Sequence, residues 1–250
     1  MSQWDNPSPT SNFLFDIARG NMVGATPVNI FGFNTVVGTD YETIWNAGGI
    51  YSFPTEAKAM TIVSSAADTM QVLINGLDAD YRQVTQIVTL TGTSPVAIPK
   101  SLLRVNSAVI LSGSNVGNIT IASGGVTYGY IQAGFGITQA CVFTVPADHK
   151  LYLFRIDLNS ATANGNKYIT IHNVNTAPNG RRLKVAQATF STSQVSYDRQ
   201  VPFMIDEKTD FSFEAKSSSG ENEVAILSSG ENEVAIFVEA VLYKNPRIYE

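Results

Sequence analysis

From Tyr41 onward, short apolar runs alternate with turn-forming residues. Runs rich in β-branched residues, separated by Gly, Asn and Ser at regular intervals, are typical of antiparallel sheet. No βαβ pattern occurs, so we expect an all-β fold, an antiparallel β-sandwich resembling a jelly roll. The predicted strands are 71–75, 84–90, 102–111, 118–122, 126–131, 140–145, 151–158, 168–174, 182–190 and 234–243, with a turn predicted at Asn75-Gly76.

The strand predicted over 151–158 has apolar residues at nearly every position, so its buried face has to be chosen from its charges. Arg155 and Asp157 share one face with Leu151 and Leu153. The other face carries only Tyr152, Phe154, Ile156 and Leu158. Because side chains alternate between the faces of a strand, we expect the second face to be the buried one.

The first 34 residues differ from the rest and predict an extended attachment arm. Residues 1–12 are rich in Pro, Ser and Asn. The apolar residues at 13–18 follow a possible cap at Ser11 or Asn12 and stop before Gly20, which predicts a short helix. We therefore expect three parts: an arm over 1–34, a β-sandwich lobe over 35–147 and a second β lobe over 148–250. One continuous sandwich over the last two parts remains an alternative.

The segment 83–147 is almost free of charge. Its 65 residues include only two charged side chains, Lys100 and Arg104, although Ser, Thr, Asn, Gln and Gly are abundant. Charged residues are depleted where protein surfaces pack on one another. The segment therefore predicts self-association of the chain, and a trimer is one arrangement compatible with it.

The charge distribution and the length of the apolar runs each argue against one class of partner. Net charge is −5, and residues 206–250 hold ten acidic and four basic side chains, so the rest of the chain is close to neutral. A nucleic-acid-binding protein needs a basic surface, which this distribution does not predict. No apolar run approaches the ~18 residues of a membrane span, so we expect no membrane partner.

Few side chains are candidates for chemistry. His149 and His172 lack the neighbouring ligands of a metal site, and Asp78 and Asp80 lack the further oxygens of a calcium loop. Cys141, the single cysteine, lies in an apolar run and is expected to be buried. No nucleophile elbow or phosphate-binding loop is found. We therefore assign no catalytic, cofactor-binding or metal-binding residue, and expect neither enzymatic activity nor a cofactor.

Two clusters could bind a ligand but have simpler interpretations. A basic group near the Asn179-Gly180 turn could dock an acidic partner or an anionic glycan, although a solvated hairpin end is favoured. An aromatic group could stack on a carbohydrate, although large aromatics at strand spacing usually belong to a core. The basic group is Arg181, Arg182 and Lys184, and the aromatic group is Trp45, Tyr51 and Phe53.

One internal repeat is present. The sequence SSGENEVAI occurs at 218–226 and again at 228–236. A ten-residue shift preserves the alternation of a strand, so either copy could enter the sheet with the same face inward. We expect the extra copy to form a hairpin or to loop out.

The order of several segments resembles a group of tailed-bacteriophage virion structural proteins, of the type common in marine and cyanobacterial phages. The segments are YETIWNAGGIYSFP at 41–54, INGLDADY at 74–81, QIVTLTGTSPVAIP at 86–99, VPADHKLYL at 145–153 and PFMIDEKTDFSFEA at 202–215. The resemblance implies a non-enzymatic, β-rich virion component, and it transfers no functional residues.

Taken together, the sequence predicts a virion protein that self-associates and docks on the phage capsid or tail, as a decoration or tail-associated adaptor protein. The alternative is a receptor- or glycan-binding fibre module. A polysaccharide-degrading spike is a third interpretation, which would need paired carboxylates on facing strands.

Overall fold

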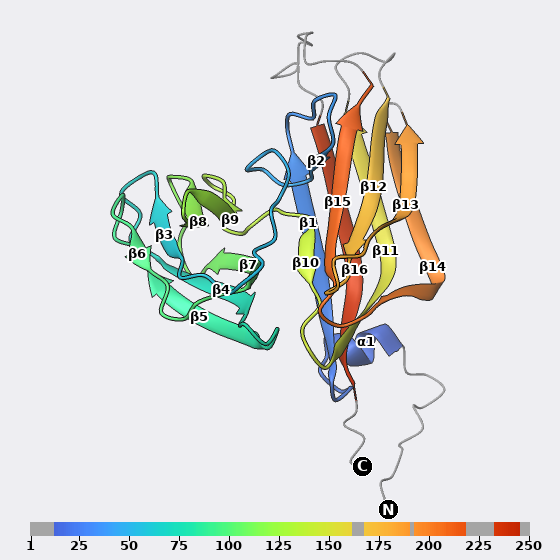
Figure 1. Ribbon diagram of the computed structural model, residues 1–250, viewed down its shortest axis with the longest axis horizontal. Coiled ribbons are helices and arrows are strands. Elements are labelled where there is room, and N and C mark those ends of the chain that lie inside the picture. The colour runs from blue at the N-terminus through green and yellow to red at the C-terminus, as the bar shows by residue number, and fades with distance from the viewer. Residues whose placement is uncertain (1–12, 162–167, 191–192, 219–232, 246–250) are drawn as a thin grey trace, which may run out of the picture.

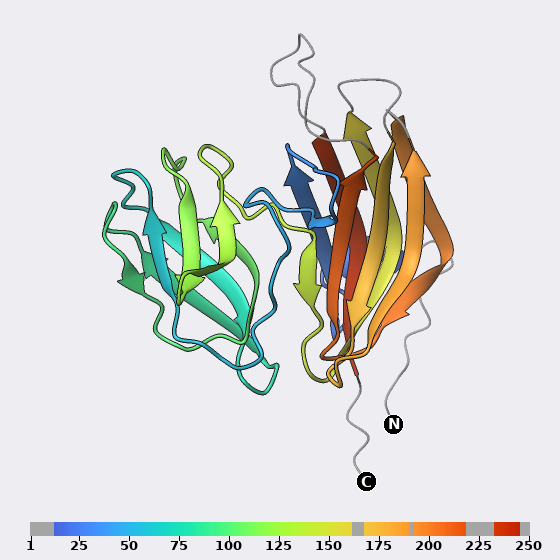
Figure 2. The same cartoon turned by 45° about the horizontal axis from the view of Figure 1, so that its top comes forward.

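Nearly all of the regular secondary structure among the described residues is antiparallel β-sheet. The computed structural model describes residues 13–161, 168–190, 193–218 and 233–245. The strands form two lobes, which lie side by side in Figures 1 and 2. The expected short helix is confirmed as α1 (Phe13–Ala18), which is followed by Gly20 at φ 75°.

The larger lobe consists of two sheets that share one core. The first sheet has the order β1 (Ala25–Asn34), β16 (Glu233–Lys244), β11 (His149–Ala161) and β14 (Ser193–Ile205). The second has the order β10 (Val142–Thr144), β15 (Asp210–Ser217), β12 (Ile169–Thr176) and β13 (Arg182–Phe190), and β2 (Glu42–Thr43) also pairs with β15. Residues of both sheets, such as Ile236 and Phe211, meet in this core.

Apart from the two-residue strand β2, the larger lobe has eight strands, and these pair in a nested order. The first strand, β1, pairs with the last, β16, and the second, β10, pairs with the seventh, β15. The third and sixth strands, β11 and β14, also pair, as do the fourth and fifth, β12 and β13. The chain of the larger lobe is therefore wrapped as one long folded hairpin.

The smaller lobe lies between β1 and β10 in the sequence, and we call it the inserted lobe. One of its sheets has the order β6 (Val96–Ala97), β3 (Thr61–Ser64), β8 (Ile119–Ser123) and β9 (Val126–Ile131). The other has the order β5 (Gln83–Thr89), β4 (Gln71–Leu77) and β7 (Arg104–Ile110). Its core is separate and includes Ile62, Ile74 and Leu102.

The expected division of the chain is wrong at two boundaries. Residues 25–34 are not part of an arm, because β1 pairs along its whole length with β16 and places Ile30 in the larger core. Residues 142–145 belong with the larger lobe, since β10 pairs with β15. The inserted lobe leaves the larger one where Trp45 and Ala140 pair across an antiparallel bridge.

The predicted buried face of 151–158 is only half correct. A register shift between Leu153 and Arg155 interrupts the alternation of β11. Leu151 and Leu153 therefore point into the core before the shift, and Ile156 and Leu158 after it. A bulge adds a residue to one strand only, so a strict period of two fails there.

The predicted turn at Asn75-Gly76 is also wrong, because both residues lie inside β4. A Cβ atom on Gly76 would come within 2.4 Å of the carbonyl oxygen of Arg104. The glycine therefore permits a close approach of β7, where the register shifts between Asn75 and Gly76.

Candidate functional site

The two lobes are joined by a buried ion pair. Arg104 of β7 donates from Nε to Oδ1 of Asp210 at 2.8 Å and from Nη2 to Oδ2 at 2.9 Å. Both side chains are almost completely buried. The Arg104 guanidinium also lies 5.3 Å from the ring centroid of Phe53 and 5.6 Å from that of Tyr81. A paired and hydrogen-bonded charge is the form in which burial is tolerated.

Further hydrogen bonds support the same junction. The Thr144 hydroxyl donates to Oδ1 of Asp210 at 2.6 Å. The Asn106 amide donates to the carbonyl of Thr144 and accepts from its N–H, both at 3.0 Å, which ties β7 to β10. Within the inserted lobe, the Tyr51 hydroxyl donates to the carbonyl of Tyr128, and burial raises the pKa of Tyr51 above its ordinary value. The Asn106–Thr144 bonds, together with the Arg104–Asp210 pair, fix the inserted lobe against the larger one.

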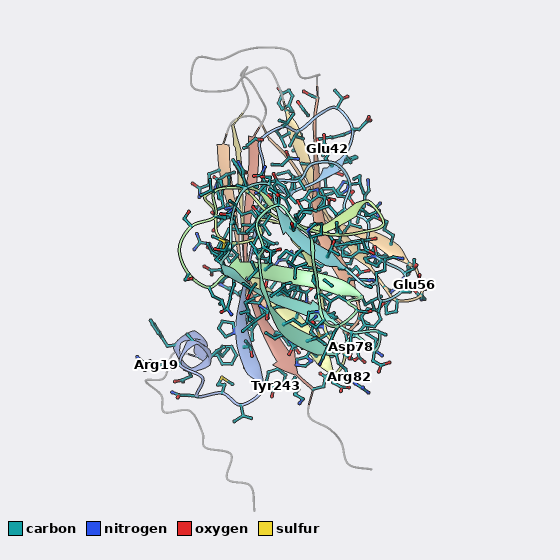
Figure 3. The ribbon with its side chains drawn as sticks, turned by 90° about the vertical axis from the view of Figure 1, so that its left-hand side faces the viewer. Arg19, Glu42, Glu56, Asp78, Arg82 and Tyr243 are labelled. Carbon is teal, nitrogen blue, oxygen red and sulfur yellow. The ribbon has the colours of Figure 1, made fainter. Side chains whose placement is uncertain are left out.

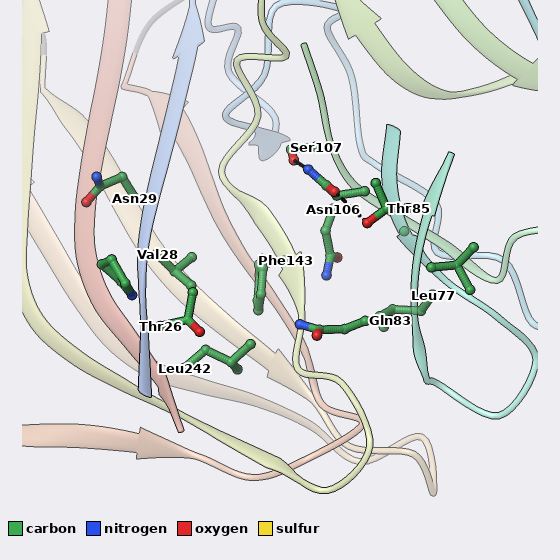
Figure 4. A pocket seen from close by; sticks show the side chains of 14 residues that line it. Thr26, Val28, Asn29, Leu77, Gln83, Thr85, Asn106, Ser107, Phe143 and Leu242 are labelled. Atoms are coloured by element: carbon green, nitrogen blue, oxygen red, sulfur yellow. Dashed lines mark hydrogen bonds between the residues drawn. The ribbon is translucent and has the colours of Figure 1, made fainter. Parts of the chain in front are cut away.

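A cleft of about 340 Å³ lies between the lobes and is shown in Figure 4. The larger lobe contributes β1, β10 and β16, and the inserted lobe contributes β4, β5 and β7. None of the lining side chains is ionisable under ordinary conditions. They are Thr26, Pro27, Val28, Asn29, Asn75, Gly76, Leu77, Gln83, Val84, Thr85, Asn106, Ser107, Phe143 and Leu242.

One wall of the cleft carries a hydrogen-bonded row of side chains from three strands. Asn75 Nδ2 donates to the Ser107 hydroxyl oxygen at 3.2 Å. The Thr85 hydroxyl donates to Asn75 Oδ1 at 3.1 Å. The row runs across β5, β4 and β7, so these polar groups are held in fixed orientations. Gln83 extends from β5 toward Phe143 on the opposite side (Figure 4).

His172 belongs to a second buried polar cluster, on the β12–β15 sheet. Its Nε2 lies 2.8 Å from Oε2 of Glu214, and Arg182 donates to the other carboxylate oxygen. Burial lowers the pKa of His172, although the bond to Glu214 acts in the opposite direction. Burial disfavours the charged form of Glu214, but the bonds from Arg182 and His172 hold its pKa below the ordinary value.

The other sequence candidates lie apart from one another. His149 opens β11, with Nδ1 2.7 Å from the carbonyl of Ala147. Asp78 accepts backbone hydrogen bonds from Asp80 and Arg82, as expected of a turn. Cys141 is buried, as predicted, and burial raises the pKa of its thiol. The described residues contain no group of three or more His, Cys, Asp or Glu side chains that could hold a metal ion.

The predicted aromatic cluster is largely buried, whereas the predicted basic cluster is exposed. Trp45 and Tyr51 are buried and contact each other edge to face, as expected of core residues rather than of a sugar-stacking surface. The basic residues at 181, 182 and 184 are exposed, but they do not all remain solvated. Arg182 pairs with Glu214, and the Lys184 ammonium lies 4.7 Å from the Tyr41 ring centroid.

The uncharged segment 83–147 contributes a largely uncharged surface. Arg104 is buried at the junction, which leaves Lys100 as its exposed charge. In Figure 3 the inserted lobe faces the viewer, and the labelled Glu56, Asp78 and Arg82 lie toward one side of it. Several large apolar side chains are nevertheless exposed on this lobe: Ile87, Leu111, Val116, Val126, Phe135 and Ile137.

No helix among the described residues is long and apolar enough to cross a membrane.

No protein-family model matches the sequence, and no curated protein matches it. Among solved structures, one of T=1 particles derived from infectious bursal virus aligns with 89% of this chain and 74% of that chain, at 10% identity and a TM-score of 0.22. The VP2 subviral particle of infectious bursal disease virus aligns with 93% of this chain and 78% of that chain, at 9% identity and a TM-score of 0.25. Similarity at this level does not assign the chain to a family.

Proposed function

We propose that the larger lobe is a jelly roll and that the chain is a non-enzymatic virion structural protein. The observation that carries this proposal is the pairing of eight strands as first with last, second with seventh, third with sixth and fourth with fifth. Eight strands wound in this way into two packed sheets, apart from the short added strand β2, describe the double-sheet jelly roll, an architecture used by viral capsid and lectin domains. The resemblance of the sequence to tailed-phage virion proteins supports the same class.

Within that class, we propose a capsid-decoration or tail-associated adaptor protein that assembles with copies of itself. The support is the surface of the inserted lobe. Phe135 and Ile137 are exposed within the segment 83–147, whose one exposed charge is Lys100. A surface that is poor in charge and exposes apolar side chains is typical of one that packs against another protein subunit. The partner proposed for this surface is a second copy of the chain.

Two matched variants test where copies meet. Phe135→Asp places a charge on the inserted lobe, and Leu183→Asp places one on β13 of the larger lobe. The two native side chains are similarly exposed, at 44% and 42%. Size-exclusion chromatography with light scattering should show self-association that Phe135→Asp weakens at least tenfold and Leu183→Asp leaves unchanged. Loss of association in Leu183→Asp alone would contradict the assignment to the inserted lobe.

Incorporation into particles tests the virion role itself. Protein purified with intact phage particles should give density for both lobes on the outside of the capsid or tail. An adaptor role requires that density to touch another virion protein. Particles that contain no copy of the chain would contradict the proposal.

A further inference from the structure

The cleft between the lobes is a candidate ligand site, and its lining does not include Phe135 or Ile137 of the proposed assembly surface. Its volume of about 340 Å³ lies within the range of small-molecule sites, about 300–1,000 Å³. The side chains that line it come from six strands of both lobes. The Arg104–Asp210 pair and the Asn106–Thr144 bonds hold the two walls together, so the cleft is formed before any ligand arrives.

The chemistry of the lining restricts the ligand to an uncharged molecule. A charged group loses its hydration on entering a cleft and needs an opposite charge to compensate. None of the lining residues offers one. Six lining residues instead carry hydroxyl or amide side chains, which recognise hydroxyl groups. They are Thr26, Asn75, Gln83, Thr85, Asn106 and Ser107, whereas the Asn29 side chain points away from the cleft (Figure 4).

The row Thr85–Asn75–Ser107 leaves hydrogen-bonding capacity of both kinds facing outward. The Thr85 hydroxyl spends its proton on Asn75, so its oxygen lone pairs can still accept. The Ser107 hydroxyl accepts from Asn75, so its proton can still be donated. The Asn75 amide thus has an acceptor, the Thr85 hydroxyl, on one side and a donor, the Ser107 hydroxyl, on the other. This pair matches two neighbouring hydroxyl groups of a ligand, because a hydroxyl group can both donate and accept.

The rest of the cleft provides an apolar wall and a free amide. Val28, Phe143 and Leu242 line the side formed by the larger lobe (Figure 4). The Gln83 amide has no hydrogen-bond partner among the residues that the structure describes, and it extends toward Phe143. A sugar ring has this same division, with hydroxyl groups at its rim and C–H groups on its faces. We infer that the cleft binds a short, neutral oligosaccharide.

An extended uncharged peptide is the competing occupant, because β1 is the outermost strand of its sheet and could pair with another strand. The sugar is favoured because the polar row lies on the inserted lobe, opposite β1, and presents side-chain groups rather than a strand edge. Binding of a peptide and not of a sugar would therefore contradict the inference.

Saturation-transfer NMR on the full chain tests the site. The probes are four neutral disaccharides (maltose, cellobiose, lactose and di-N-acetylchitobiose), the charged sugar sialyllactose and an acetylated Thr-Val-Thr-Val-Thr amide. We expect saturation transfer to at least one neutral disaccharide and to neither of the other probes. Absence of transfer to all four disaccharides, or transfer to the peptide or sialyllactose alone, would overturn the inference.

Three variants place the binding in the cleft. Thr85→Arg fills the cleft and should abolish transfer, whereas Thr89→Arg adds the same charge four residues further along exposed positions of β5, outside the cleft, and should preserve it. Gln83→Ala removes one exposed amide with little risk to folding and should weaken binding roughly tenfold. Transfer that is unchanged in both Thr85→Arg and Gln83→Ala would place the sugar elsewhere and refute the site.

Discussion

Arg104 of the inserted lobe and Asp210 of the larger lobe form a two-point ion pair, with Nε–Oδ1 and Nη2–Oδ2 distances of 2.8 and 2.9 Å. The two residues are 106 positions apart in the sequence. Their contact fixes the orientation of one lobe against the other, and it uses one of the only two charges in the segment 83–147. Because Arg104 is buried at the junction, the segment 83–147 keeps only Lys100 as an exposed charge.

Breaking this pair should be costly. Arg104→Met leaves Asp210 buried, with the Thr144 hydroxyl as its one side-chain partner among the described residues, and we expect a loss of about 3–5 kcal/mol in the free energy of unfolding. Arg82→Met removes an arginine from an exposed pair with Asp80 and should cost less than about 1 kcal/mol. Urea unfolding of both variants measures the difference. Equal losses would mean that the junction pair is dispensable.

Asp68 should act as an internal anchor of the inserted lobe. Burial disfavours its charged form, but the Ser64 hydroxyl at 2.6 Å and the N–H groups of Val116 and Gly117 at 2.9 Å lower its pKa. A carboxyl whose pKa is lowered on folding stabilises above its unfolded pKa and loses that contribution as pH falls through its folded pKa. Asp68→Asn should cost about 2 kcal/mol near pH 7 and less in acid.

The control for Asp68 is Asp80→Asn, which changes an exposed carboxylate in the turn after β4. Urea unfolding near pH 7 should barely distinguish that variant from the parent chain. A similar loss in both variants would show that the three bonds to Asp68 add no stability.

His172 should make the protein less stable in mild acid. The groups that face it are Glu214 of β15, Arg182 and Lys184 of β13, and the Tyr41 ring at 4.0 Å between centroids. Because folding lowers the pKa of His172, the unfolded chain takes up this proton first, at about pH 6.5. Stability contributed by His172 is therefore lost as pH falls from about 6.5 toward the folded pKa.

The variant His172→Gln removes this proton uptake and keeps a donor for Glu214. The difference in unfolding free energy between about pH 7.5 and about pH 5.5 should be smaller in the variant than in the parent chain. A larger difference in the variant would mean that His172 is protonated in the folded state across this range.

Because of the repeat, the fold should tolerate deletion of one of the two copies. Deleting residues 218–227 puts Ser228 in the place of Ser218, whose hydroxyl accepts from the N–H of Tyr168 at 2.9 Å, and keeps the alternation of β16. The first copy lies largely outside the described residues. We expect a small change in thermal stability. Ile236→Asp puts a charge at a fully buried position of β16 and should cost more than about 4 kcal/mol. Comparable losses would show that the first copy is required.

Local patterns predicted much of the secondary structure, because strand formation follows from nearby residues. The ranges 126–131 and 182–190 match β9 and β13, and α1 coincides with the apolar run at 13–18. The wrapping of the chain could not be predicted in the same way. The pairing of β1 with β16 joins segments about 200 residues apart, and no local pattern records such a partner.

The site was less predictable than the fold. Arg104 was visible as a rare charge, but its partner could not be chosen among many acidic residues from sequence alone. His172 and Glu214 are opposite each other only because β12 and β15 pair in a particular register. The cleft depends on how the two lobes meet, and its neutral side chains carry no motif. Its one advance signal was the lack of charge in the segment 83–147.

Sedimentation velocity of the purified full chain, over a range of protein concentrations at low and high salt, tests the central claim of self-association most directly. Contacts made by uncharged polar and apolar side chains are screened little by salt. The protein should therefore sediment as an oligomer whose dissociation constant changes less than about threefold between roughly 0.05 and 0.5 M salt. A monomer at every concentration and salt would contradict the account.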